Sequence, residues 1–148
     1  MVSKTTLCNQ LTELLDGNYV HSLGPVSIAE MKAFMENETE KNGINLFDRF
    51  PILEEYVYGP LLRGKNRFID EDYNKTILDR IDLFIYCYPG LMAVTNWGDR
   101  AQMDGVKENV VEVINRYNHL VLKLQSMGYK VREYNFKCDD YKKLTEDI

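Results

Sequence analysis

Residues 44–62 read INLFDRFPILEEYVYGPLL. The first four form a short strand candidate, and a helix is predicted after Pro51, from Ile52 to Leu62. Asp48 and Arg49 stand directly between the two elements. Open parallel α/β sheets bind ligands at the carboxyl ends of their strands. The stretch therefore predicts both an α/β fold and the position of a binding site.

Strands alternate with helices on both sides of this stretch. The hydrophobic pattern predicts further strands over 19–21, 83–88 and 129–136. It predicts helices over 5–16, 27–42 with Ser27 as the N-cap, 70–80 and about 106–127. This alternation favours one α/β domain spanning residues 1–148 with a largely parallel sheet. Residues 91–105 are expected to form a polar lid, and residues 137–148 a charged, frayed tail.

The composition limits the class of protein. Of 148 residues, 45% are apolar and 28% are charged, which excludes a disordered, collagen-like or small disulfide-stapled chain. The formal net charge of −5 argues against broad binding to nucleic acid or to an anionic membrane. No apolar run approaches the roughly 20 residues that span a bilayer, and the first residues do not resemble a signal peptide. With three scattered cysteines, we expect a reducing, cytoplasmic location.

Charged and polar groups that could bind an anion or move a proton recur along the chain. Asp48 can hold a proton, and the adjacent Arg49 can bind a phosphate. The other candidates are the turn from His21 to Pro25, the basic loop Arg63, Lys65 and Arg67, Arg100 in the lid, and Lys4-Thr5 at the start of the first helix. Lys4-Thr5 matches only the end of the phosphate-binding pattern G-x-x-x-x-G-K-[ST]. Each of these segments also fits an ordinary polar turn or a solvated surface.

Together these features resemble the thymidylate-kinase-like and deoxynucleoside-kinase-like P-loop kinases, particularly compact phage versions. The resemblance is densest over residues 47–60, FDRFPILEEYVYGP, which are similar to the family's Asp-Arg motif and the helix after it. Residues 85–89 resemble the strand that leads into the family's lid. Residues 105–109, 116–117 and 128–134 resemble its closing helix and strand. The resemblance implies a three-layer α/β sandwich that transfers the γ-phosphate of ATP, with Mg²⁺, to a deoxynucleoside or its monophosphate.

The resemblance also implies a role for individual residues. Asp48 would act as the acceptor-side base, Arg49 would hold the phosphoryl group, and Arg100 would be the lid arginine. Phosphates would contact Lys4, Thr5, Arg63 and Arg67, with the Thr5 hydroxyl on Mg²⁺. The acceptor would contact His21, Gly24, Pro25, Glu55 and Tyr58.

The sequence departs from the family at two places. One is Glu54, which stands where relatives often have a small hydroxyl residue, and the other is the segment before Lys4. The family begins with a buried strand and a full glycine loop, and neither stands before Lys4 here. We therefore expect weak ATP affinity for residues 1–148 alone, restored by an added upstream strand and loop. An alternative is a catalytically decayed relative that binds a nucleotide or a protein. In that case the sheet edge exposed by the missing strand would pair with a partner or a second copy of the chain.

Overall fold

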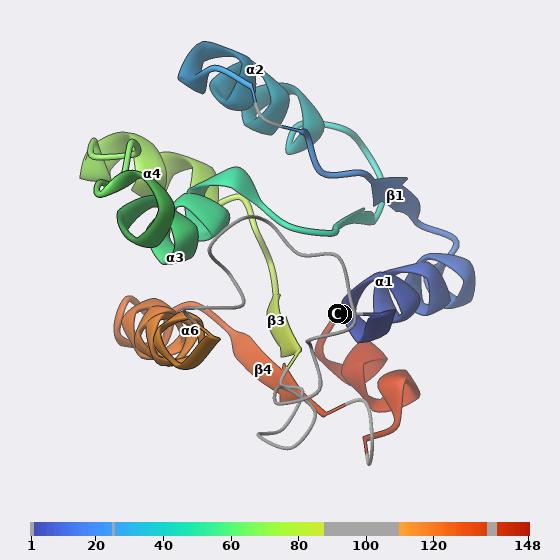
Figure 1. The fold of residues 1–148 in the computed structure, drawn as a ribbon. Coiled ribbons are helices and arrows are strands. Elements are labelled where there is room, and N and C mark those ends of the chain that lie inside the picture. Colours follow the sequence, from blue (N-terminus) through green and yellow to red (C-terminus); the bar gives the residue numbers. More distant parts are fainter. Residues whose placement is uncertain (1, 25, 88–109, 136–138) are drawn as a thin grey trace.

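Helices and parallel strands alternate along the chain. A computed structural model describes residues 2–24, 26–87, 110–135 and 139–148 (Figure 1). The element order is α1 (Val2–Leu15), β1 (Asn18–Val20), α2 (Ile28–Glu38), β2 (Asn45–Phe47), α3 (Pro51–Arg63), α4 (Glu71–Leu78), β3 (Phe84–Cys87), α6 (Val110–Ser126), β4 (Val131–Tyr134) and the 3₁₀ helix η2 (Tyr141–Asp147). The predicted α/β class is confirmed. The expected lid at 91–105 lies outside the described residues.

The described strands form two separate parallel pairs. β1 pairs with β2, placing Tyr19 opposite Leu46, and β3 pairs with β4, placing Ile85 opposite Arg132. A helix lies within each crossover, as parallel strands require. The described part of the sheet therefore consists of two short two-stranded pieces.

Apolar clusters cover both faces of the β3–β4 pair. One cluster contains Leu7 and Leu11 of α1 together with Tyr134 of β4, and Ile85 packs against it. The larger cluster lies among α2, α3, α4 and α6 and includes Phe84. Because successive strand residues point to opposite faces, β3 is covered on both sides, giving a helix–strand–helix arrangement. No described helix is both long and apolar enough to cross a bilayer.

The second helix begins as predicted but ends earlier. The Ser27 hydroxyl accepts a hydrogen bond from the Glu30 N–H at 3.2 Å, which confirms Ser27 as the N-cap. The helix was expected to reach Asn42, yet α2 ends at Glu38. At its C-cap, the Thr39 hydroxyl donates to the Met35 carbonyl at 2.6 Å. Threonine side chains compete in this way with continued helical hydrogen bonding.

The prediction of a frayed tail is wrong for the end of the chain. The helix η2 packs against α1, and Leu144 is buried in the smaller apolar cluster. Arg132 of β4 donates two hydrogen bonds to the Asp147 carboxylate, at 2.9 and 3.0 Å. Tyr141 packs against the same cluster, so two apolar side chains and one ion pair dock this charged segment.

Helix α3 contains a proline whose missing N–H is replaced by an arginine from α6. Pro60 cannot donate to the Tyr56 carbonyl, four residues earlier. The Arg116 guanidinium donates to that carbonyl at 2.7 and 3.2 Å, and to the Val57 carbonyl at 3.0 Å. The side chain of Arg116 thereby ties α6 to the helix that follows the Asp48–Arg49 turn.

The loss of stability on replacing Arg116 should therefore depend on whether residue 60 is a proline. We expect Arg116→Met to lower the free energy of unfolding by about 2 kcal/mol, because it leaves a part-buried carbonyl without a donor. In a Pro60→Ala background the helical N–H is restored, so the same substitution should cost about half as much. Urea unfolding of the four proteins measures the coupling. Equal losses in both backgrounds would show that Arg116 does not compensate for the proline.

Candidate functional site

Asp48 lies where three elements meet. It follows the last residue of β2, and only 8% of it is exposed. Its Oδ2 atom accepts hydrogen bonds from the Thr5 hydroxyl of α1 at 2.9 Å and from the Tyr19 hydroxyl of β1 at 2.6 Å. Asp48 directly follows a strand, as the sequence predicts, and the structure places it beside the first turns of α1.

Tyr19 is held as a neutral hydrogen-bond donor. Burial, the hydrogen bond to Asp48 and the negative charge of that residue raise the pKa of Tyr19 to about 12. Its ring contacts the His21 ring, with centroids 4.3 Å apart. Tyr19 therefore donates to the Asp48 carboxylate throughout the neutral pH range.

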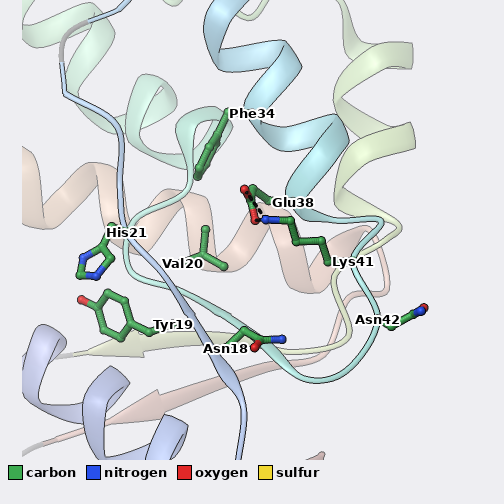
Figure 2. A pocket seen from close by; sticks show the side chains of 8 residues that line it. All are labelled: Asn18, Tyr19, Val20, His21, Phe34, Glu38, Lys41 and Asn42. Carbon is green, nitrogen blue, oxygen red and sulfur yellow. Dashed lines mark hydrogen bonds and ion pairs between the residues drawn. The ribbon is translucent and has the colours of Figure 1, made fainter.

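His21 lies beside this centre rather than within its cavity. It lines a separate pocket of about 390 Å³ formed by β1 and α2, which includes Glu38 and Lys41 (Figure 2). His21 was expected to face the same cleft as Asp48, but it follows the last residue of β1 and does not line the Asp48 cavity. Gly24, the next acceptor candidate along the chain, is exposed.

Arg49 has a strained backbone. Its φ angle is +71°, in the left-handed region that residues with a Cβ adopt at a cost of roughly 1–2 kcal/mol. Such strain is concentrated at functional sites, where the surrounding structure imposes it. The turn that joins β2 to α3 therefore stores strain at the residue predicted to bind phosphate.

Two tyrosines and a glutamate stand close to Arg49. The Tyr117 hydroxyl lies 3.3 Å from the Tyr58 hydroxyl. Burial raises the pKa of both tyrosines, and the charge of Glu54 raises it further, while Arg49 partly offsets the rise. The Tyr117 ring also stacks on Tyr86, at 5.5 Å between centroids. Both hydroxyl groups are therefore uncharged at neutral pH.

One cavity brings most of these groups together. Its volume is about 560 Å³, within the range of roughly 300–1,000 Å³ that holds small ligands. It is lined by Asp48, Arg49, Glu54, Tyr58 and Tyr117. The same cavity continues along β2 and β3, where apolar side chains line it together with polar ones such as Lys41, Asn45 and Arg80. Its polar end offers two carboxylates, a guanidinium and two neutral hydroxyl groups to one ligand.

Glu55, Arg63 and Arg67 form a different cluster. The Glu55 side chain is buried, and it accepts hydrogen bonds from the Arg63 guanidinium and from Arg67 through Nε at 3.0 Å, Nη2 at 3.1 Å and the main-chain N–H at 3.0 Å. A Cβ at Gly59 would stand 2.9 Å from Oε1 of Glu55 and 2.7 Å from the Lys65 carbonyl oxygen, so glycine permits this close approach. The cluster closes the loop after α3.

None of these three residues lines the Asp48 cavity. The roles of Glu55 at the acceptor and of Arg63 and Arg67 at phosphate stay predictions. In the structure, both carboxylate oxygens of Glu55 accept hydrogen bonds from Arg63 or Arg67.

Three predicted site residues fall outside what the structure describes. These are Pro25, Arg100 and the side chain of Lys4. In the other direction, sequence analysis gave no site role to Tyr19 or Tyr117. Tyr19 could have been found from strand alternation, which places it on the same face as His21. Tyr117 carried no local signal, because it belongs to the apolar stripe of its helix.

Among the charged residues, the buried Glu55 should be one whose substitution lowers the stability of the protein most. We expect Glu55→Gln to lower the free energy of unfolding by about 3 kcal/mol, because it leaves two arginines beside a neutral side chain. The exposed pair between Lys75 and Asp79 is the matched control. There, Lys75→Ala should cost about 0.5 kcal/mol or less. Urea unfolding at neutral pH measures both, and equal losses would contradict a special role for Glu55.

Stability should also depend on pH through Glu55. Burial opposes its ionisation, but the hydrogen bonds from Arg67 and the charges of Arg63 and Arg67 outweigh burial and lower the pKa of Glu55. Its stabilisation is therefore complete above the ordinary carboxyl pKa of about 4.3 and is lost as the pH falls through the lower folded value. Glu55→Gln should make the acid-side decline in the urea midpoint shallower.

Comparison with known proteins finds a likeness among solved structures. No family model and no curated protein matches the chain. Among solved structures, it is similar to the YorR protein from Bacillus subtilis, crystallised in complex with phosphorylated GDP. The TM-score is 0.73 at 12% identity, over 97% of this chain and 85% of that one. The two chains therefore share a fold.

Proposed function

We propose that this chain is a nucleotide-kinase relative that binds a nucleotide at the Asp48 end of the cavity. The reaction would transfer a phosphoryl group from ATP to a deoxynucleoside or its monophosphate. One observation carries the proposal: Thr5, Asp48 and Arg49 converge where a helix begins and a parallel strand ends. The fold shared with the nucleotide-bound YorR structure supports it.

The residues suit positioning and electrostatic stabilisation, on which phosphoryl transfer mainly depends. Asp48 already accepts two hydroxyl hydrogen bonds, so its carboxylate could also orient an acceptor hydroxyl and take its proton. Arg49 would pair with a phosphate at the rim of the cavity. Tyr58 and Tyr117 are neutral, so they could donate hydrogen bonds to the nucleotide without repelling its charge.

Magnesium fits the donor set beside α1. The Thr5 hydroxyl and the Asp48 carboxylate present oxygen atoms 2.9 Å apart. Mg²⁺ is usually held by one or two carboxylates and by the phosphates of the nucleotide, so it needs few protein ligands. When bound with ATP it would neutralise charge on the phosphates. Within the described part of the chain, no three His, Cys, Asp or Glu side chains form a dedicated metal site.

Thermal shift measurements test the proposal directly. The chain would be heated with ATP–Mg²⁺ and, separately, with each deoxynucleoside and its monophosphate. Stabilisation by both ATP and one acceptor supports an enzyme, whereas stabilisation by one class only supports a nucleotide-binding module. Stabilisation by neither would contradict nucleotide binding and leave the interaction alternative.

Asp48→Asn should abolish phosphoryl transfer and leave a folded protein. The amide preserves the shape of the side chain and one acceptor oxygen, but it cannot take a proton. Tyr19→Phe is the matched control, because it removes only one hydrogen bond to the same oxygen. Turnover should be measured by a coupled assay for ADP, with near-UV circular dichroism for the fold. Near-normal turnover by a folded Asp48→Asn variant would exclude Asp48 as the acceptor-side group.

Two substitutions at Arg49 separate backbone strain from charge. Arg49→Ala removes the guanidinium and keeps the strain, whereas Arg49→Gly removes both. We expect the glycine variant to be about 1 kcal/mol more stable than the alanine variant, because glycine adopts positive φ without a Cβ clash. Both should bind nucleotide more weakly than the parent, as measured by calorimetry. Unchanged affinity in both variants would rule out a phosphate contact.

A further inference from the structure

Glu54 lines the cavity together with two tyrosines that lie close to it. It stands in the first turn of α3, one helical turn before Tyr58, so the two side chains share a face of that helix. Tyr117 comes from α6, which packs against α3 (Figure 1). We call the part of the cavity lined by these three residues the Glu54 corner. The proposed function assigns no role to its carboxylate.

Negative charge dominates the electrostatics of the Glu54 corner. Burial is the main cause of the raised pKa of Tyr58 and of Tyr117, and the charge of Glu54 is the next. Arg49 acts in the opposite direction at both hydroxyl groups, but its effect is smaller than that of Glu54. A phosphate group would therefore be repelled at this corner, whereas a ligand group that donates hydrogen bonds would be attracted.

The polar groups of the corner favour a donor on the ligand. The Tyr117 hydroxyl donates to the Tyr58 hydroxyl at 3.3 Å, so the Tyr117 proton is used within the corner. An ionised carboxylate only accepts hydrogen bonds, and it has about four lone-pair positions. Glu54 can therefore accept from a ligand in addition to its contacts within the protein. An N–H group would form a charge-assisted hydrogen bond there, whereas a carbonyl oxygen would face the carboxylate without a proton between them.

Two stacked aromatic pairs line the same cavity. Tyr86 of β3 stacks on Tyr117, with 5.5 Å between the ring centroids and 21° between the ring planes. Phe47 stacks on Phe50, with 5.1 Å between the centroids and 18° between the planes. Aromatic walls of this kind suit a flat ring with apolar faces. A nucleobase combines such faces with an edge of hydrogen-bonding groups.

We propose that Glu54 is the specificity-determining residue for the acceptor, and that it selects a nucleobase that carries an exocyclic amino group. The inference rests on the proposed function, because it places the base of the acceptor at the Glu54 corner. Cytosine presents an amino group where uracil and thymine present a carbonyl, and carboxylates accept hydrogen bonds from this amino group. Guanine likewise carries an amino group that hypoxanthine lacks. Asp48 and Arg49 keep the roles proposed for them at the acceptor hydroxyl and the phosphate.

Nucleoside pairs that differ in the amino group test the inference. Deoxycytidine would be compared with deoxyuridine, and deoxyguanosine with deoxyinosine, by calorimetry at neutral pH. We expect the parent chain to bind the amino-bearing member of each pair about 10-fold more tightly. In Glu54→Gln this preference should fall to about twofold or less, because an amide can also donate a hydrogen bond to a carbonyl.

Asp82→Asn is the matched control for Glu54→Gln. Asp82 lines the same cavity, but it lies in the loop before β3. The control variant removes the same charge from the cavity and should keep the preference of the parent chain. Near-UV circular dichroism would compare the fold of both variants with the parent. An equal loss of preference in the two variants would overturn the inference, because total charge rather than Glu54 would then select the base.

The remaining outcomes separate this inference from the proposed function. Equal affinity of the parent chain for both members of each pair would overturn the inference, whereas binding of these nucleosides and of ATP–Mg²⁺ would still support the proposed function. Full retention of the preference by a folded Glu54→Gln variant would overturn the role of Glu54 in the same way. Binding of no nucleoside and no ATP–Mg²⁺ would overturn both.

Discussion

Apolar packing of α1 across both strand pairs holds the described structure together. Leu7 and Leu11 belong to one cluster with Tyr134 of β4, and Leu46 of β2 and Ile85 of β3 pack against that cluster. Within the described residues, no ladder of hydrogen bonds joins β2 to β3. Among these residues, packing of α1 rather than a shared hydrogen-bond ladder therefore links the two strand pairs.

The same packing sets the geometry of the candidate site. It brings the first turns of α1 to the carboxyl end of β2, where Thr5 reaches Asp48. Tyr19 arrives from the adjacent strand, and partial burial together with Asp48 keeps it protonated. Strain at Arg49 is sustained because the elements on either side of the turn are independently anchored, β2 by its pairing with β1 and α3 by its contact with α6.

Two sets of polar contacts anchor α3, the helix that follows this turn. Arg116 donates to the carbonyl that Pro60 leaves without a helical donor. Glu55 accepts hydrogen bonds from Arg63 at the end of α3 and from Arg67 in the following loop. Both sets of contacts are partly or fully buried, and an unpaired polar group at such a place would lower the stability of the fold. They hold in place the helix that carries Tyr58 to the cavity, so they support the site without lining it.

The sequence by itself determined the order of strands and helices, the Ser27 cap and the place of Asp48 and Arg49 after a strand. Hydrophobic periodicity, capping and turn chemistry are local, so neighbouring residues are enough to reveal them. Only the tertiary structure decided that Tyr19 donates a hydrogen bond to Asp48, 29 residues away, and that Arg67 donates to Glu55, 12 residues away. It also decided that the charged tail docks on α1 and that the described strands form two separate pairs. These features depend on which surfaces meet in space, and no local pattern of residues encodes that.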